Sequence, residues 1–138
     1  MLDSLKVLRV YIRDCTPTKN ILLSAHVKSA GSILLPTDIV SEDNDHNQSE
    51  TVKYVTGKKP YIEVAVNNIP RGFDSVEFIT YLSDGSFINT IDTVTMVVVD
   101  TVQSDVILEL TARCAKQCCT HFSVLSLVRG KSGWYLRN

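Results

Sequence analysis

The residues best suited to chemistry are three thiols and an imidazole near the C-terminal end of the chain, at Cys114, Cys118, Cys119 and His121. Thiolates and imidazoles are the ligands that zinc prefers. A zinc ribbon or finger holds its ion with two ligand pairs on separate turns, whereas Cys15, His26 and His46 are isolated in the sequence. We therefore expect small thiols that fill gaps beside the core. A metal-dependent hydrolase built on this cluster is the alternative.

A second candidate is an acidic loop, in which Glu42, Asp43 and Asp45 offer the hard oxygen ligands that calcium uses. The loop fails the EF-hand pattern. With Asp43 as position one, Gln48 stands where glycine is needed and Tyr54 stands where the bidentate glutamate should be. We expect an ordinary exposed loop, and weak cation binding by Asp43 and Asp45 stays open.

A third candidate is basic, because Lys58, Lys59 and Arg71 could form an anion-binding corner if their two turns lie at the same end of the fold. A solvated hairpin tip is the alternative. The sequence contains no nucleophile elbow, phosphate loop, H-E-x-x-H motif or dinucleotide fingerprint. We assign no catalytic residue, metal ligand or cofactor, and we predict a protein that is not an enzyme.

The composition predicts one cytoplasmic domain spanning residues 1–138, with 44% hydrophobic residues. Fourteen basic and fifteen acidic residues leave a formal charge of −1, so no overall field attracts nucleic acid or an anionic membrane. Residues 1–6 lack the pattern of an export signal, and no stretch approaches the ~20 apolar residues of a membrane span. In a reducing compartment the four cysteines are expected to be thiols.

The stretch from residue 60 to residue 100 predicts the centre of the fold. Apolar and polar residues alternate through residues 61–66 and again through residues 76–82, which is the period of a strand with one buried face. Residues 94–99 are apolar at almost every position and rich in β-branched types, so we expect a central strand covered on both faces.

Shorter runs of the same kind predict the remaining strands, at residues 6–12, 21–27, 33–35, 51–55, 106–110, 121–128 and 134–137. We expect a hairpin turn at residues 29–32 and a solvated loop over residues 38–50. Residues 112–119 read equally well as a short helix or a loop. The sequence thus predicts an all-β antiparallel sandwich of about nine short strands, with that one helix as an option.

Several segments, taken in order, resemble the TerD-domain family of calcium-binding β-sandwich proteins associated with tellurite resistance and stress response. They are I-L-L-S-A-H-V-K-S-A-G-S-I-L-L-P-T-D-I-V, I-E-V-A-V-N-N-I-P-R-G-F-D-S-V-E-F-I-T-Y, F-I-N-T-I-D-T-V-T-M-V-V-V-D and F-S-V-L-S-L-V-R-G-K-S-G-W-Y-L-R. They cover residues from about 20 to the C-terminus. The I-P-x-x-F-D-x-V turn and the closing G-W carry most of the resemblance.

The resemblance implies a calcium site, and this chain departs from it in both regions concerned. Family members carry aspartates before the first hairpin, where residues 21–25 read I-L-L-S-A, and an acid-rich loop before the central strand, where Lys58 and Lys59 stand. Two unit charges ~4 Å apart at an effective dielectric of ~20 interact by about 4 kcal/mol, so a lysine there opposes cation binding. We expect a divergent member that has lost the metal.

These expectations lead to a non-enzymatic TerD-like binding module that acts through protein contacts in a stress or tellurite-resistance system. The alternative is a small self-assembling structural or accessory protein of a phage or mobile element. In either case we expect a protein partner or self-association, without nucleic acid or membrane. The expected interaction surface consists of apolar, basic and aromatic residues, namely Ile33, Leu34, Leu35, Lys58, Lys59, Arg71, Trp134 and Tyr135; core packing is the other interpretation of the apolar and aromatic ones.

Overall fold

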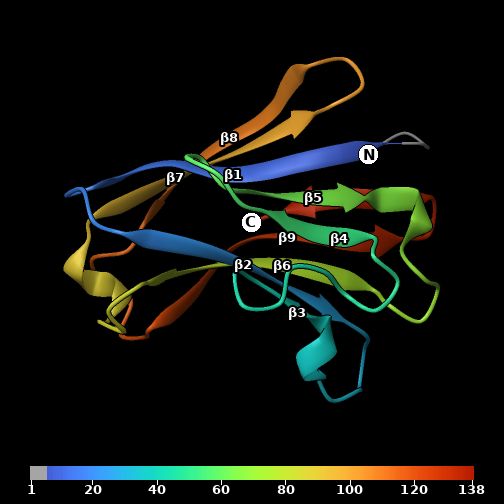
Figure 1. The fold of residues 1–138 in the computed structure, drawn as a ribbon, viewed down its shortest axis with the longest axis horizontal. Coiled ribbons are helices and arrows are strands. Elements are labelled where there is room, and N and C mark those ends of the chain that lie inside the picture. The colour runs from blue at the N-terminus through green and yellow to red at the C-terminus, as the bar shows by residue number, and fades with distance from the viewer. Residues whose placement is uncertain (1–5) are drawn as a thin grey trace.

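The computed structural model describes residues 6–138, which form two antiparallel five-stranded sheets packed face to face (Figure 1). The prediction of an all-β sandwich is confirmed. In the first sheet the strands lie in the order β4 (Val52–Val55), β5 (Tyr61–Ala65), β1 (Val7–Thr16), β7 (Thr93–Asp100) and β8 (Asp105–Arg113). In the second they lie in the order β10 (Gly133–Arg137), β9 (His121–Gly130), β6 (Ser75–Leu82), β2 (Ile21–Lys28) and β3 (Ile39–Val40).

The core lies between the sheets and is built from alternate residues of their strands. Leu8, Ile62, Phe78 and Leu127 are fully buried there. Strand β7 is covered on both faces, as its sequence predicts, because residues 94–98 are all buried. It is not the central strand, however. That place belongs to β1, which pairs with β5 on one side and β7 on the other.

The predicted return strand at residues 33–35 is wrong. The strand that pairs with β2 is β3, whose Ile39 and Val40 lie opposite His26 and Ala25. Between them Pro36 opens the 3-10 turn η1 (Pro36–Asp38). Because proline fixes φ and has no N–H to donate, strand pairing resumes only after the turn. Residues 33–35 are left as an irregular loop.

The helix considered at residues 112–119 is also wrong. Strand β8 continues through Ala112 and Arg113, which pair with Val94 and Thr93, and turns follow up to β9. Packing of Ala112 against the core outweighs the weak helical spacing of its neighbours. Residues 6–138 contain no α-helix. Besides η1, they contain the 3-10 turns η2 (Val66–Asn68) and η3 (Ile88–Thr90). None of the described helices is long and apolar enough to span a membrane.

The loop over residues 38–50 is solvated only in part. Asn47 is buried, and its side-chain oxygen accepts the Val52 N–H at 2.9 Å. The Tyr54 N–H donates to the carbonyl of Asp45 at 2.8 Å. The loop therefore supplies hydrogen-bond partners along the outer edge of β4, which closes that edge of the first sheet.

Candidate functional site

A groove of about 410 Å³ lies on the second sheet, beside the connection from β2 to β3. Lys28, Ser75 and Val128 line it as neighbours in one cross-strand row of β2, β6 and β9. Ile33 and Leu34 line it from the connection itself. Two residues of the predicted interaction surface thus border a real concavity.

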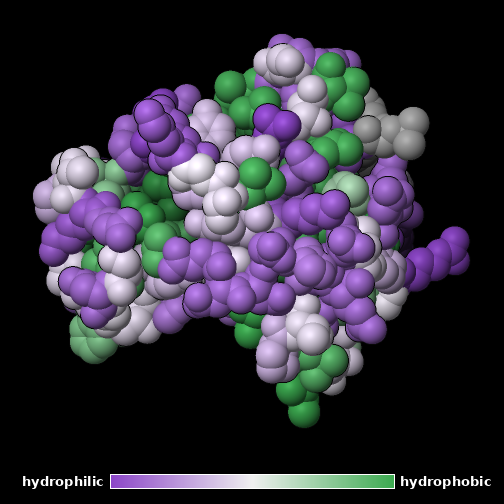
Figure 2. Space-filling view, in the orientation of Figure 1, coloured by the Kyte–Doolittle hydropathy of each residue, from purple (hydrophilic) through white to green (hydrophobic). Residues whose placement is uncertain are grey.

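The connection exposes apolar side chains beside this groove. Ile33 is 88% exposed and Leu35 is 52% exposed, while Leu34 is half-buried. In Figure 2 the loop appears as an apolar knob at the lower edge of the molecule. The groove thus combines an apolar rim with the polar residues of the sheet.

The most unusual group in the groove is the carboxylate of Asp38, at the end of η1. Asp38 is only 7% exposed and lines the groove. Its side chain has no hydrogen-bond or ion-pair partner among residues 6–138. No fully buried side-chain oxygen of these residues lacks a partner, so the Asp38 carboxylate oxygens are open to water in the groove. Burial raises the pKa of this carboxyl above its ordinary value. The groove therefore contains a carboxylate that has no ion-pair partner within residues 6–138.

The other charged groups of the groove are already engaged or exposed. The Lys28 ammonium donates to Glu77 at 2.8 Å, and Asp74 accepts the Ala30 N–H at 2.8 Å. Arg137 reaches the groove from the exposed end of β10. A cationic ligand group is the electrostatic complement of the Asp38 carboxylate, in a groove that Lys28 and Arg137 also line.

The predicted basic corner does not form. Lys58 and Lys59 precede β5, whereas Arg71 lies in the connection that follows it, so the residues lie at opposite ends of that strand (Figure 1). All three are exposed. An extended strand separates its ends in proportion to its length, and the two turns cannot share one anion.

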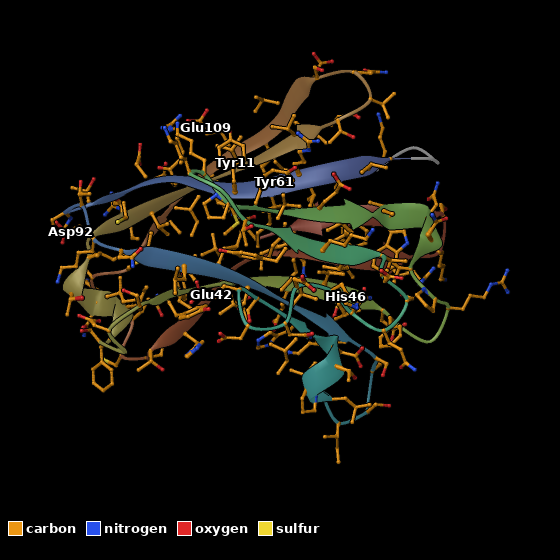
Figure 3. The ribbon with its side chains drawn as sticks, in the orientation of Figure 1. Tyr11, Glu42, His46, Tyr61, Asp92 and Glu109 are labelled. Carbon is orange, nitrogen blue, oxygen red and sulfur yellow. The ribbon has the colours of Figure 1, made fainter. Side chains whose placement is uncertain are left out.

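Lys59 instead joins a second concavity on the outer face of the first sheet, of about 300 Å³. Arg9 lines it as well. So do Tyr11 and Tyr61, which are labelled in Figure 3. The Arg9 guanidinium lies 4.7 Å from the centre of the Tyr61 ring and pairs with Glu63 at 3.5 Å. Its charge is therefore satisfied within the chain, unlike that of Asp38.

Trp134 belongs to the core and not to a surface. It is 4% exposed, and the Arg129 guanidinium lies 4.4 Å from its ring centre. Arg129 also donates to the backbone carbonyls of Ile69, Pro70 and Phe73. The alternation of β10 directs Trp134 inward and leaves Tyr135 half-buried on the other face.

The cysteine cluster is not brought together as a metal site. Cys114 is buried and its pKa is raised to about 11 by burial, whereas Cys118 is exposed and Cys119 is half-buried. The His121 ring stacks on Tyr81, with 4.9 Å between ring centres. Within residues 6–138 no three His, Cys, Asp or Glu side chains are grouped as metal ligands would be.

The acidic loop makes local contacts. The Asp43 N–H donates to the Ser41 hydroxyl at 3.2 Å, and the Asp45 carboxylate lies 2.7 Å from His46 Nδ1. Glu42 and His46 project from this loop in Figure 3. Of the acidic side chains in this loop, that of Asp45 is thus already in contact with a neighbouring side chain.

Sequence reasoning missed Asp38, a mostly buried acid that lines the groove. Its segment reads L-L-P-T-D-I-V, in which a single acid stands between apolar residues. An acid in that setting is a candidate for burial, and burial without a partner is costly. The sequence therefore contained a pattern that indicates a buried acid, but the burial itself depends on the turn that begins at Pro36.

No protein-family model matches the chain, and no curated protein matches it significantly. The resemblance to the TerD-domain family therefore depends on the sequence segments that carry it.

Proposed function

We propose that this chain is a non-enzymatic protein-binding module whose groove accepts an apolar peptide segment carrying a lysine or arginine. The observation that supports the proposal is the carboxylate of Asp38, which has no partner among residues 6–138 and opens onto an apolar-rimmed groove. Partial desolvation disfavours the charged form of Asp38, and a cation that binds beside the carboxylate offsets this cost. Ile33 and Leu34 then contact the apolar side chains that lie next to the lysine or arginine in the peptide.

We further propose that the module is of the TerD-like type, without the calcium site, and acts in a stress or tellurite-resistance assembly. The order of the resembling segments and the sandwich architecture support this. Lys58 and Lys59 stand in the region where the family carries acids. Calcium titration by calorimetry tests this part, because micromolar binding would contradict the proposed loss of the site.

A second candidate function is self-assembly, as a structural or accessory protein of a phage or mobile element. One observation favours it. Strand β8 ends the first sheet and is exposed along most of its length. An open strand edge is a template for pairing with another chain.

The groove is tested with a small probe, N-acetyl-leucyl-arginine amide, and with its citrulline counterpart, which keeps the shape and removes the charge. We expect the arginine probe to shift the amide NMR signals around Asp38, Ile33 and Ser75, and the citrulline probe to bind at least tenfold more weakly. Asp38→Asn should abolish the difference between the two probes. Asp43→Asn, which changes an exposed acid outside the groove, is the control.

Equal binding of the two probes, or a difference that persists in Asp38→Asn, would contradict the proposal. So would the absence of any shift in the groove at millimolar probe, since a site built for a cation must respond at that concentration.

A further inference from the structure

Strand β8 (Asp105–Arg113) is the most exposed strand of the first sheet. It lies beside β7 on one side only, and the β7–β8 hairpin leans away from the rest of the sandwich (Figure 1). The opposite edge of the same sheet, at β4, is covered by the loop that contains Asp45 and Asn47. The two edges are therefore unequal, and only that of β8 lacks such a cover within residues 6–138.

Two backbone hydrogen bonds fix which groups of β8 point outward. The Cys114 N–H donates to the Asp92 carbonyl at 2.7 Å, so the backbone of Cys114 faces β7. The Thr101 N–H donates to the Val7 carbonyl at 3.0 Å. The backbone N–H and C=O groups of the odd-numbered residues of β7 therefore face β1, and those of the even-numbered residues face β8. Backbone groups alternate along a strand. The N–H and C=O groups of Glu109, Thr111 and Arg113 therefore point away from the sheet.

The regular part of this edge is limited by a bulge. The register between β7 and β8 shifts at Ile107, because Val98 lies opposite Leu108 while Val99 lies opposite Val106. A bulge interrupts pairing with a further strand. The usable edge thus runs from Leu108 to Cys114, with Thr111 at its centre.

We propose that two copies of this chain pair through their β8 strands, antiparallel and with Thr111 opposite Thr111 on the two-fold axis. In this register Glu109 of each copy lies opposite Arg113 of the other. Opposite charges in directly paired positions stabilise a sheet, and so does a threonine pair. The outward backbone groups of Glu109, Thr111 and Arg113 meet as hydrogen-bonded pairs, and the two five-stranded sheets become continuous.

The charges of the strand are arranged for this partner. Arg113 is exposed and has no ion-pair partner among residues 6–138. Glu109 is held by Arg13 of its own copy and points outward at the top of Figure 3. In the dimer each Glu109 lies between two guanidinium groups, one from each copy.

The neighbouring registers are less favourable. Centring the pair on Glu109 places two glutamates opposite each other and extends the pairing across the Ile107 bulge. Centring it on Leu110 places Arg113 opposite Ile107 and leaves both charges without a counterpart. The two-fold axis at Thr111 alone satisfies the outward backbone groups and the charges together.

The apolar face of β8 gains from the same arrangement. Leu110 and Ala112 pack against the core and remain half-buried. In the proposed register Leu110 of each copy lies opposite Ala112 of the other. Beside them a concavity of about 320 Å³ runs between Leu108 and Leu136. Joining the copies extends this apolar layer across the axis and removes more of its surface from water.

The decisive experiment is a charge exchange followed by sedimentation over a range of protein concentrations. We expect wild type to dimerise, and Arg113→Glu to weaken the dimer about tenfold or more because glutamates then face each other twice. Glu109→Arg should weaken it similarly. The double variant Glu109→Arg/Arg113→Glu restores opposite charges and should recover the dimer. Lys116→Glu, the same charge change beyond the strand, is the control.

A cross-link tests the register itself. Residues in a hydrogen-bonded antiparallel pair have Cα atoms about 5.5 Å apart, within disulfide range. Thr111→Cys in a Cys118→Ser background should therefore form a disulfide-linked dimer under mild oxidation. Thr90→Cys in the same background, exposed in η3 and outside the strand, should not.

A monomer at all concentrations, or a double variant no better than the single ones, would overturn the proposal. A dimer in which Thr111→Cys and Thr90→Cys cross-link equally would overturn the register. The inference does not depend on the Asp38 groove. Loss of the dimer with intact probe binding at Asp38 contradicts self-pairing alone, and the reverse result contradicts the groove alone.

Discussion

The ammonium group of Lys6 and the carboxylate of Asp100 meet at 2.5 Å, across the end of the β1–β7 pair. The second oxygen of Asp100 accepts the Val102 N–H at 2.9 Å, in the turn from β7 to β8. Asp100 is buried. One side chain thus fixes the start of β1 and the base of the hairpin that carries the proposed dimer edge.

Asp100→Asn should destabilise the protein at neutral pH. The hydrogen bond from Lys6 lowers the pKa of the Asp100 carboxyl, and burial partly opposes this. A lowered folded-state pKa stabilises the fold above the unfolded value near 3.9, and this stabilisation is lost as the pH falls through the folded value. Urea unfolding of the two proteins should therefore differ at pH 7 and converge in strong acid.

Asp105→Asn is the matched control, because Asp105 is exposed at the start of β8. It should leave the midpoint of unfolding almost unchanged across the same pH range. A difference between Asp100→Asn and wild type that is constant with pH would show that the ion pair is not its source.

Asp38→Asn should have the opposite effect and stabilise the free protein at pH 7. Burial raises the pKa of the Asp38 carboxyl, so the charged form is penalised only in the folded state. The penalty begins above the unfolded pKa near 3.9 and is complete above the folded pKa. We expect a small rise in melting temperature at pH 7 that disappears below about pH 4.

Calorimetric melting of Asp38→Asn, Asp43→Asn and wild type at pH 4 and pH 7 measures this effect. Asp43 is exposed, and Asp43→Asn should leave the melting temperature unchanged at both pH values. A lower melting temperature for Asp38→Asn at pH 7 would mean that the carboxylate already has a partner in the free protein.

The strands with one buried face could be predicted from the sequence alone. Ile62 and Val64 in β5, like Val76 and Phe78 in β6, are buried at alternate positions, which is the pattern their residue types show. The apolar run of β7 likewise predicted its burial on both faces. These features are local, because burial of a sheet face repeats every second residue.

The pairing of strands and the position of the groove could not be predicted in this way. Residues 33–35 have the composition of a strand, yet β3 begins only at Ile39, after the turn opened by Pro36. The burial of Asp38 follows from that turn and from the neighbouring sheet. Similarly, Trp134 has the composition of an interface residue, but its place depends on Arg129. Each of these outcomes is set by contacts between distant segments.

The four cysteines should differ in reactivity toward iodoacetamide. Burial raises the pKa of Cys114 to about 11, so almost none of it is thiolate at pH 8, and thiolate is the reactive form. Cys118 is exposed and Cys119 half-buried, while Cys15 is buried. Peptide mapping by mass spectrometry should show Cys118 alkylated first and Cys114 last, with all four equal in denaturant. Early labelling of Cys114 in the native protein would contradict its burial.

Arg129→Met should destabilise the protein by about 2 kcal/mol, since it leaves the carbonyls of Ile69 and Phe73 without their donor and removes the cation from the Trp134 ring. The Pro70 carbonyl keeps the Phe73 N–H as a donor at 3.0 Å. Methionine keeps much of the apolar stem, so the loss reports the guanidinium. Urea unfolding gives the free energy, and tryptophan fluorescence should shift to longer wavelength as water reaches the ring.

Arg71→Met is the matched control, at an exposed position in the connection from β5 to β6 that also contains Ile69, Pro70 and Phe73. It should change the free energy of unfolding by less than about 0.5 kcal/mol. If Arg129→Met behaved like this control, the carbonyls of Ile69 and Phe73 would have to be satisfied by water, and the residue would be a surface arginine. A large loss of stability with unchanged fluorescence would separate the two roles, because it would assign the stabilisation to the carbonyl contacts and not to the stacked ring.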